Sequence, residues 1–227
     1  MKFTISLVIA LGLAVAATAT GGLYALQGGG AATHIGHIMD EAPNPPEGLE
    51  GLGYLQMLQE EIESSVAIMG LVTPASAGRL QLRLTARQVM RCVDRLAEPV
   101  VFMRGDPEGH CGRVYFGIRP AAEAIISHVQ LATESTDASP AVRTHATHVI
   151  ASANNIISRS DEIEELVRQV FEGDDTEAFR PLVVRIGELV DALLHGVDAN
   201  GDGTIGWQEG EGGADAISQH MGLMQAG

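Results

Sequence analysis

Residues 139–171, SPAVRTHATHVIASANNIISRSDEIEELVRQVF, carry the clearest helical pattern in the chain. Ser139 followed by Pro140 is typical of a helix start, because serine caps the free N–H groups and proline fits the first turn. The stretch predicts one helix from 139 to 159 and a second from 161 to 171. Apolar side chains at helical spacing give the first of these a core face: Val142, Val149 and Ile156.

Amphipathic helices of the same kind extend over much of the chain on either side. Their expected ranges are 52–71, 75–97 and 120–135, and a further helix leads into residue 198. Strand patterns are nearly absent, and aromatic residues make up only 4% of the chain. Long helices with short connections predict an all-α helical bundle over residues 51–172. Residues 20–50, rich in Gly and Pro, are expected to form a flexible tether with one helical turn around His34 to Asp40.

Residues 198–209 read Asp-Ala-Asn-Gly-Asp-Gly-Thr-Ile-Gly-Trp-Gln-Glu. Ca²⁺ takes about six to eight oxygen ligands, so a site needs many oxygens from one short segment. Three oxygen-bearing side chains alternate here, Gly203 permits a sharp turn, and an acidic residue closes the segment. Thr204 would act through its carbonyl and Gly206 through a bridging water. The expected calcium ligands are Asp198, Asn200, Asp202, Thr204, Gly206 and Glu209.

This segment resembles the calmodulin-type EF-hand loop, position for position. The resemblance implies a C-terminal helix-loop-helix over residues 173–227, in which Glu209 closes the calcium shell with both carboxylate oxygens. A single, unpaired hand would leave Ile205 available to a protein partner or to a second copy of the chain. Downstream, Gly210 and Gly213 stand where a sensor hand carries large apolar residues, so a calmodulin-like groove is not expected.

Histidines form two H-x-x-H pairs, His34 with His37 and His145 with His148. Each pair is followed by two apolar residues, which suggests an internal repeat. Residues three apart share a helix face, so each pair can place two imidazoles together, and His128 on another predicted helix could join them. Such a set could bind zinc, copper or nickel, or ligate a b-type haem. The alternative is that these are ordinary surface or core histidines.

Arginines recur at strict four-residue steps in the predicted helix from 75 to 97. On a helix this spacing makes a slowly drifting stripe. One interpretation is an adaptor that binds acidic ligands through the stripe. The alternative is a seam of internal ion pairs, which the chain's excess of glutamate and aspartate favours. The stripe consists of Arg79, Arg83, Arg87, Arg91 and Arg95.

The N-terminus has the layout of a secretory signal peptide over residues 1–19. A lysine precedes an apolar run, and Ala17-Thr18-Ala19 is an A-x-A cleavage signal. Cleavage would place the protein in the periplasm or outside the cell, with no membrane span left; the alternative is an anchor formed by an uncleaved N-terminal helix. In an oxidising compartment Cys92 and Cys111, the two cysteines of the chain, are expected to pair.

Charge and motif content narrow the function classes. The 29 acidic residues outnumber the 14 basic ones, and a net charge of −15 repels nucleic acid and attracts cations. The sequence contains no G-x-S-x-G, H-E-x-x-H, P-loop or G-x-G-x-x-G, so no motif points to an enzyme. The leading prediction is an exported calcium-binding helical protein whose ion orders the C-terminal hand or supports a partner. The alternatives are a histidine-based metal or haem binder and the arginine-stripe adaptor.

Overall fold

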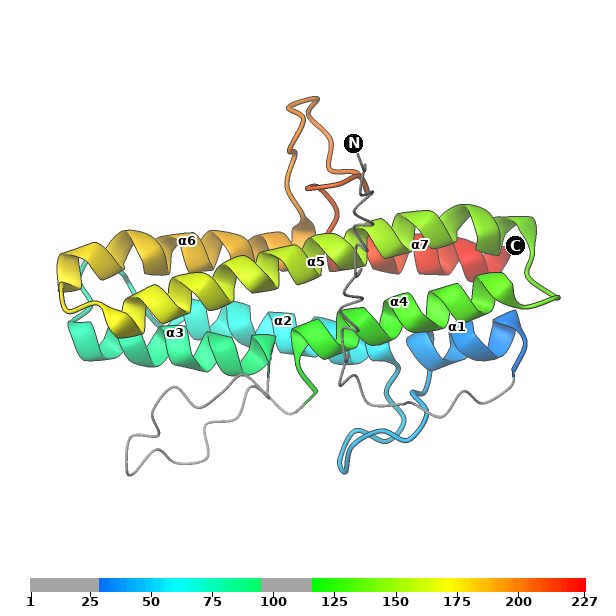
Figure 1. Ribbon diagram of the computed structural model, residues 1–227, viewed down its shortest axis with the longest axis horizontal. Coiled ribbons are helices and arrows are strands. Elements are labelled where there is room, and N and C mark those ends of the chain that lie inside the picture. The colour runs from blue at the N-terminus through cyan, green and yellow to red at the C-terminus, as the bar shows by residue number, and fades with distance from the viewer. Residues whose placement is uncertain (1–28, 95–115) are drawn as a thin grey trace, which may run out of the picture.

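The computed structural model describes residues 29–94 and 116–227. Within these ranges the chain forms helices and no strands, which confirms the predicted all-α bundle (Figure 1). None of these helices combines the length and the apolar character needed to cross a membrane. The helices are α1 (Ala31–Met39), α2 (Tyr54–Gly70), α3 (Arg79–Val93), α4 (Ile118–Glu134), α5 (Pro140–Glu172), α6 (Thr176–His195) and α7 (Ala214–Ala226).

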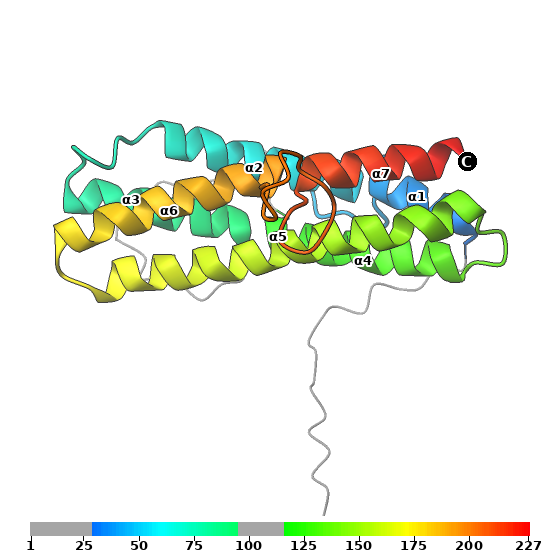
Figure 2. The same ribbon diagram turned by 90° about the horizontal axis from the view of Figure 1, so that it is seen from above.

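The helices lie end to end in four antiparallel rods, as Figures 1 and 2 show from two directions. The first rod is α1 followed by α2, the second is α3 followed by α4, the third is α5 alone, and the fourth is α6 followed by α7. The continuous rod α5 packs against α3, α4, α6 and α7. Two halves of the chain therefore have the same plan, each running out along one rod and back along another.

All four rods contribute to one apolar core. Leu58, Ile125, Ile156 and Ile186, one from each rod, are fully buried in it. Ile217 and Met221 of α7 belong to the same core. The helices of the C-terminal region 173–227 therefore pack into the same core as those of residues 51–172.

The segment 20–50, predicted as a tether, contains α1. Its apolar residues Ile35 and Ile38 are buried, and the backbone N–H of Ala31 donates to the Asp137 carboxylate at 2.9 Å. An acidic side chain at a helix N-terminus accepts a hydrogen bond from a free backbone N–H and interacts favourably with the helix dipole. Because Asp137 lies in the turn between α4 and α5, this contact fixes α1 at the same end of the bundle.

Helix α5 is continuous where two helices were predicted. The start is as expected: the Ser139 hydroxyl accepts the N–H of Val142 at 3.2 Å. The predicted break near residue 160 was wrong, since Ser160 is fully buried in the middle of the helix. Serine and aspartate cost only a few tenths of a kcal/mol inside a helix, and packing on four neighbouring helices outweighs that cost.

The first and fourth rods are each interrupted by a loop whose two ends meet. In the loop 40–53, the N–H of Ala42 donates to the carbonyl of Leu52 at 2.9 Å. In the loop 196–213, the N–H of Val197 donates to the carbonyl of Glu211 at 3.0 Å. This second loop projects from the side of the bundle (Figure 1). Each loop therefore leaves its rod and returns close to the point of departure.

A glycine permits each of these closures. A Cβ on Gly53 would lie 2.4 Å from the carbonyl oxygen of Ile38. A Cβ on Gly213 would lie 2.7 Å from the carbonyl oxygen of Leu194 and from the nitrogen of Gly196. Real Cβ atoms do not approach backbone this closely, so both positions require glycine.

The arginine stripe on α3 faces the protein itself. Arg83 donates to the carbonyls of Val170 and Phe171 at 3.1 Å and caps the C-terminal end of α5. Arg79 pairs with Asp174 at 3.7 Å, and Arg87 is buried. Arg95 lies outside the described residues. The two arginines at the start of the stripe thus stabilise a helix terminus, where cations are favourable.

Of the two cysteines in the predicted disulfide, the structure describes only Cys92. Cys92 is fully buried near the end of α3 and is disulfide-bonded. Cys111 lies outside the described residues, so the pairing of the two cysteines stays a prediction. Residues 1–19, which carry the predicted signal peptide, also lie outside them.

Candidate metal centres

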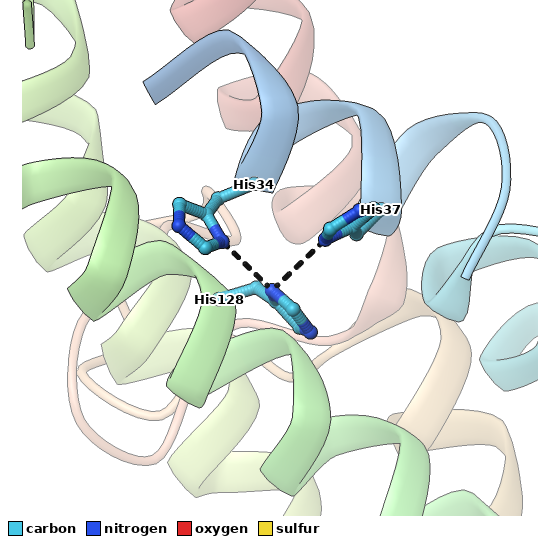
Figure 3. Close-up of side chains that lie close together, drawn as sticks. All are labelled: His34, His37 and His128. Carbon is cyan, nitrogen blue, oxygen red and sulfur yellow. Dashed lines mark hydrogen bonds between the residues drawn. The ribbon is translucent and has the colours of Figure 1, made fainter. Parts of the chain in front are cut away.

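The structure brings the histidines together in two groups of three. The first triad is His34 and His37 from α1 with His128 from α4 (Figure 3). The second triad is His145 and His148 from α5 with His220 from α7. In each triad one nitrogen from every imidazole lies within 4.8 Å of the others. Among the described residues, these are the groups whose histidine, cysteine or carboxylate ligand atoms converge in this way.

The two triads have nearly the same internal geometry. In the first, the Nδ1 atom of His128 lies 3.2 Å from that of His34 and 3.4 Å from that of His37. In the second, the Nδ1 atom of His220 lies 3.1 Å from that of His145 and 3.4 Å from that of His148. We call His128 and His220 the central histidines, because each faces both members of an H-x-x-H pair.

The ring arrangement is also similar in the two triads. Ring centroids within the first triad are 5.8, 5.4 and 4.9 Å apart. The corresponding separations in the second triad are 5.5, 5.2 and 4.5 Å. Two antiparallel helices, one carrying the pair and the other carrying the central histidine, produce this constellation twice.

Hydrogen bonding alone does not account for three converging Nδ1 atoms. A neutral imidazole nitrogen offers either one proton or one lone pair. The Nδ1 of a central histidine therefore cannot make two good hydrogen bonds to the two nitrogens that it faces. A cation accepting all three lone pairs removes this conflict. A tetrahedral ion bonded to nitrogen at about 2.0–2.1 Å holds two such ligands about 3.3–3.4 Å apart, close to the spacing found in both triads.

Burial keeps the central imidazoles in the form that metal ions bind. The pKa of His128 is lowered to about 4, mainly by desolvation and then by the neighbouring His37 and His34. The pKa of His220 is also lowered to about 4, by desolvation and then by His148 and His145. Both side chains are therefore neutral at neutral pH, with lone pairs available for coordination.

An aromatic ring stacks on one histidine of each triad. Tyr54, at the start of α2, lies 5.3 Å from the ring of His128 with the planes 26° apart. Trp207, in the projecting loop, lies 3.9 Å from the ring of His148 with the planes 17° apart. Tyr54 is buried, whereas Trp207 is half-buried. The first triad is thus covered from within the bundle and the second from a loop.

The predicted set of five histidines is corrected in two ways. His34, His37, His128, His145 and His148 do not converge on one centre but divide between two. The sixth histidine of the two triads, His220, was missed because α7 has a weak apolar pattern and carries a glycine at position 222. A signal was present: Ala-Ile-x-x-His-x-x-Leu occurs at residues 124–131 and again at 216–223.

The predicted calcium loop is partly organised. The Asp198 carboxylate accepts the N–H groups of Gly201, Asp202 and Gly203 at 2.7, 3.1 and 2.9 Å. Asn200 accepts the N–H of Asp202 at 2.8 Å. All predicted ligands except Gly206 are exposed. The first half of the loop therefore turns sharply about the Asp198 carboxylate.

The closing glutamate borders a cleft lined by residues of α5 and α6. Glu209 lines an open cleft of about 900 Å³ with Asn155 and Arg159. It is not part of a convergent ligand group in the described chain. Helix α7 begins only at Ala214 and continues the direction of α6 (Figure 2). The segment 198–209 therefore lies between two helices that follow one another along the fourth rod, and calcium binding by it stays a prediction.

Comparison with known proteins gives no family assignment. No family model matches the chain, and no curated protein or solved structure shows significant similarity to it. The site geometry is therefore the basis for any functional conclusion.

Proposed function

We propose that this chain is an exported protein that binds two transition-metal ions, one in each histidine triad. The observation that carries the proposal is the repeated convergence of three Nδ1 atoms, with neighbouring nitrogens 3.1–3.4 Å apart in both triads. Zn²⁺, Cu²⁺, Co²⁺ and Ni²⁺ accept imidazole ligands, and three histidines leave one coordination position open. The negative net charge adds a long-range attraction for cations.

The geometry favours a single ion over a haem in each site. Two axial histidines of a haem lie on opposite faces of a porphyrin, so a flat ring must fit between them. The Nδ1 atoms of each triad instead face one another at hydrogen-bond distance. The apolar run and A-x-A signal at residues 1–19 support export, with an uncleaved anchor as the alternative.

Metal titration of the purified protein tests the proposal. Co²⁺ serves as the probe because its visible absorption reports tetrahedral nitrogen coordination. We expect two ions per chain for the natural sequence and one for either His37→Ala or His145→Ala. These variants remove partly buried members of different triads and leave the central histidines in place. A folded natural protein that binds no Co²⁺ or Zn²⁺ would contradict the proposal.

A second candidate function is calcium binding by residues 198–209. The observation that favours it is the turn in which three successive N–H groups point at the Asp198 carboxylate. Ca²⁺ would draw Glu209 toward this turn and complete the oxygen shell. Calcium at 100-fold excess over Kd should raise the free energy of unfolding by about 2.7 kcal/mol.

The calcium function has its own measurement. Trp207 is the only tryptophan, so its emission reports directly on the loop. We expect Ca²⁺ to change this emission in the natural protein and to have no effect in Glu209→Gln, which lacks the bidentate carboxylate. Unchanged emission and unchanged melting in millimolar Ca²⁺ would reject calcium binding by the loop. This outcome would not bear on the proposal that the triads bind transition metals.

A further inference from the structure

The projecting loop and the second triad share one face of α5. His148, Ser152, Asn155 and Arg159 follow one another at steps of four, three and four, so they lie along a single face of that helix. Every one of these side chains contacts the second half of the loop. The metal ligand His148 is therefore the first member of the surface on which the loop is seated.

Hydrogen bonds fix the loop on this face. Asn155 accepts the N–H of Gly210 at 2.8 Å and donates to the carbonyl of Gln208 at 2.7 Å. The buried Arg159 donates to the carbonyls of Gly210 and Glu211 at 2.7 Å and of Gly212 at 2.8 Å. The Ser152 hydroxyl lies so close that a Cβ on Gly212 would be 2.3 Å from it. Residues 208–212 are thus held firmly by α5.

The first half of the loop lacks this support. Residues 198–204 are exposed, and the hydrogen bonds of Asp198, Asn200 and Asp202 are made within the segment itself. Trp207 and Glu209 flank Gln208, whose carbonyl is bonded to Asn155. An ion bound between Asp198 and Glu209 would join the free half of the loop to the anchored half. The backbone on either side of the indole ring would then be restrained.

We propose that Trp207 is a positioning residue that links ion binding in the loop to metal binding at the second triad. This inference rests on the proposed function of both sites. Calcium fixes the indole against the His148 ring, and the stacked ring holds the imidazole with its Nδ1 toward His220. Calcium therefore raises the affinity of the second triad for its metal, and metal in that triad raises the affinity of the loop for calcium by the same factor.

The first triad supplies an internal control. Its stacking partner Tyr54 is the first residue of α2 and is buried, so it does not belong to the projecting loop. Calcium should therefore leave the affinity of the first triad unchanged.

The experiment measures Co²⁺ binding to single-triad variants of the full chain, with and without millimolar Ca²⁺. His37→Ala retains the second triad, and calcium should lower its Kd for Co²⁺ by about 5-fold or more, within the usual range of coupling between sites. His145→Ala retains the first triad, and its Kd should be the same in both conditions. Calorimetric Ca²⁺ titration and thermal melting establish that each variant binds calcium and is folded.

Replacing Trp207 tests whether calcium changes the Co²⁺ affinity of the second triad through the indole ring or through a general stabilisation of the protein. In His37→Ala combined with Trp207→Ala, the Kd for Co²⁺ should no longer depend on calcium, while Trp207→Phe should retain part of the dependence because a ring remains. The linkage is overturned if calcium and cobalt both bind and the Kd of the second triad does not change. It is also overturned if the loop binds no calcium. Absence of Co²⁺ binding in both single-triad variants would instead reject the proposed function.

Discussion

The two triads differ in what surrounds the same set of ligands. In the first, His34 and His128 are only 4% and 7% exposed, and a buried tyrosine covers the central ring. In the second, His145 and His148 are half-buried, and a tryptophan from a projecting loop covers one of them. The helix frame thus sets the geometry of the ligands, whereas the covering residues set how easily solvent and ions reach them.

The largest expected effect is loss of one site by removal of its central histidine. His128→Gln and His220→Gln should each lower metal affinity at the affected triad by more than about 100-fold, the upper end of what loss of an outer-shell partner costs. The other triad should keep its affinity. Competitive titration against a chelator of known affinity measures both sites. Loss of both sites in a folded single variant would show that the triads are not independent.

The next largest effect is expected when the closed ends of the loop 196–213 are disturbed, because only the second triad contacts this loop. Gly213→Ala places a methyl group against the backbone of Gly196 and Leu194, and overpacking of this kind costs about 1–3 kcal/mol of unfolding free energy. Metal binding should weaken at the second triad only. Gly222→Ala is the matched control in the same helix, because a Cβ there meets nothing within 4 Å and alanine favours a helix by about 0.5–1 kcal/mol. Chemical denaturation measures both variants; equal destabilisation would contradict the role of Gly213.

A pH dependence is expected from both central histidines of the metal-free protein. Their folded pKa of about 4 is below the ordinary value of 6.5, so the unfolded chain takes up protons first as the pH falls. The stabilising effect of the neutral form is present above pH 6.5 and is lost as the pH falls toward 4. The slope approaches about 1.4 kcal/mol per pH unit for each group. Denaturation at several pH values should show the slope reduced by one group in His128→Gln.

The smallest expected effect is a difference in the rate at which bound metal leaves the two triads. A chelator should remove metal from the second triad about tenfold faster than from the first, which corresponds to a difference of about 1.4 kcal/mol in the opening needed. His145→Ala and His37→Ala, each with one triad left, allow the two rates to be measured separately by stopped-flow absorption of bound Co²⁺. Faster release from the first triad would mean that burial does not control exchange.

The sequence predicted the helices better than their continuity. The cap at Ser139 and the apolar spacing of α5 are local properties, and both were confirmed. The break near Ser160 was wrong, and α1 is a longer and more firmly packed helix than the single turn expected within the tether, because the outcome at both places depends on distant partners. Helix α1 has only nine residues and relies on Asp137, which is more than one hundred positions away. Short helices of this kind gain most of their stability from packing.

The candidate sites likewise have a part that local sequence predicts and a part that depends on how distant helices pair. The H-x-x-H pairs could be recognised because both histidines lie on one helix face, which is a local property. Which third histidine completes each pair depends on the antiparallel pairing of α1 with α4 and of α5 with α7. His128 was included as a candidate and His220 was not. A lone histidine has no H-x-x-H partner to mark it, so the one signal for His220 was the sequence pattern that it shares with His128.

The close approach of the loop ends at Gly196 and Gly213 also determines which sequence changes the chain can accept during evolution. Because the loop returns to its starting point, the number of residues between these two positions is independent of the helical register of α6 and α7. Doubling the length of such a loop costs only about 0.6 kcal/mol in closure entropy. The fourth rod can therefore accept insertions, deletions or a different ion-binding loop at this point without moving His220. The bundle supplies a fixed frame, and the junction is a place where new control elements can be added to it.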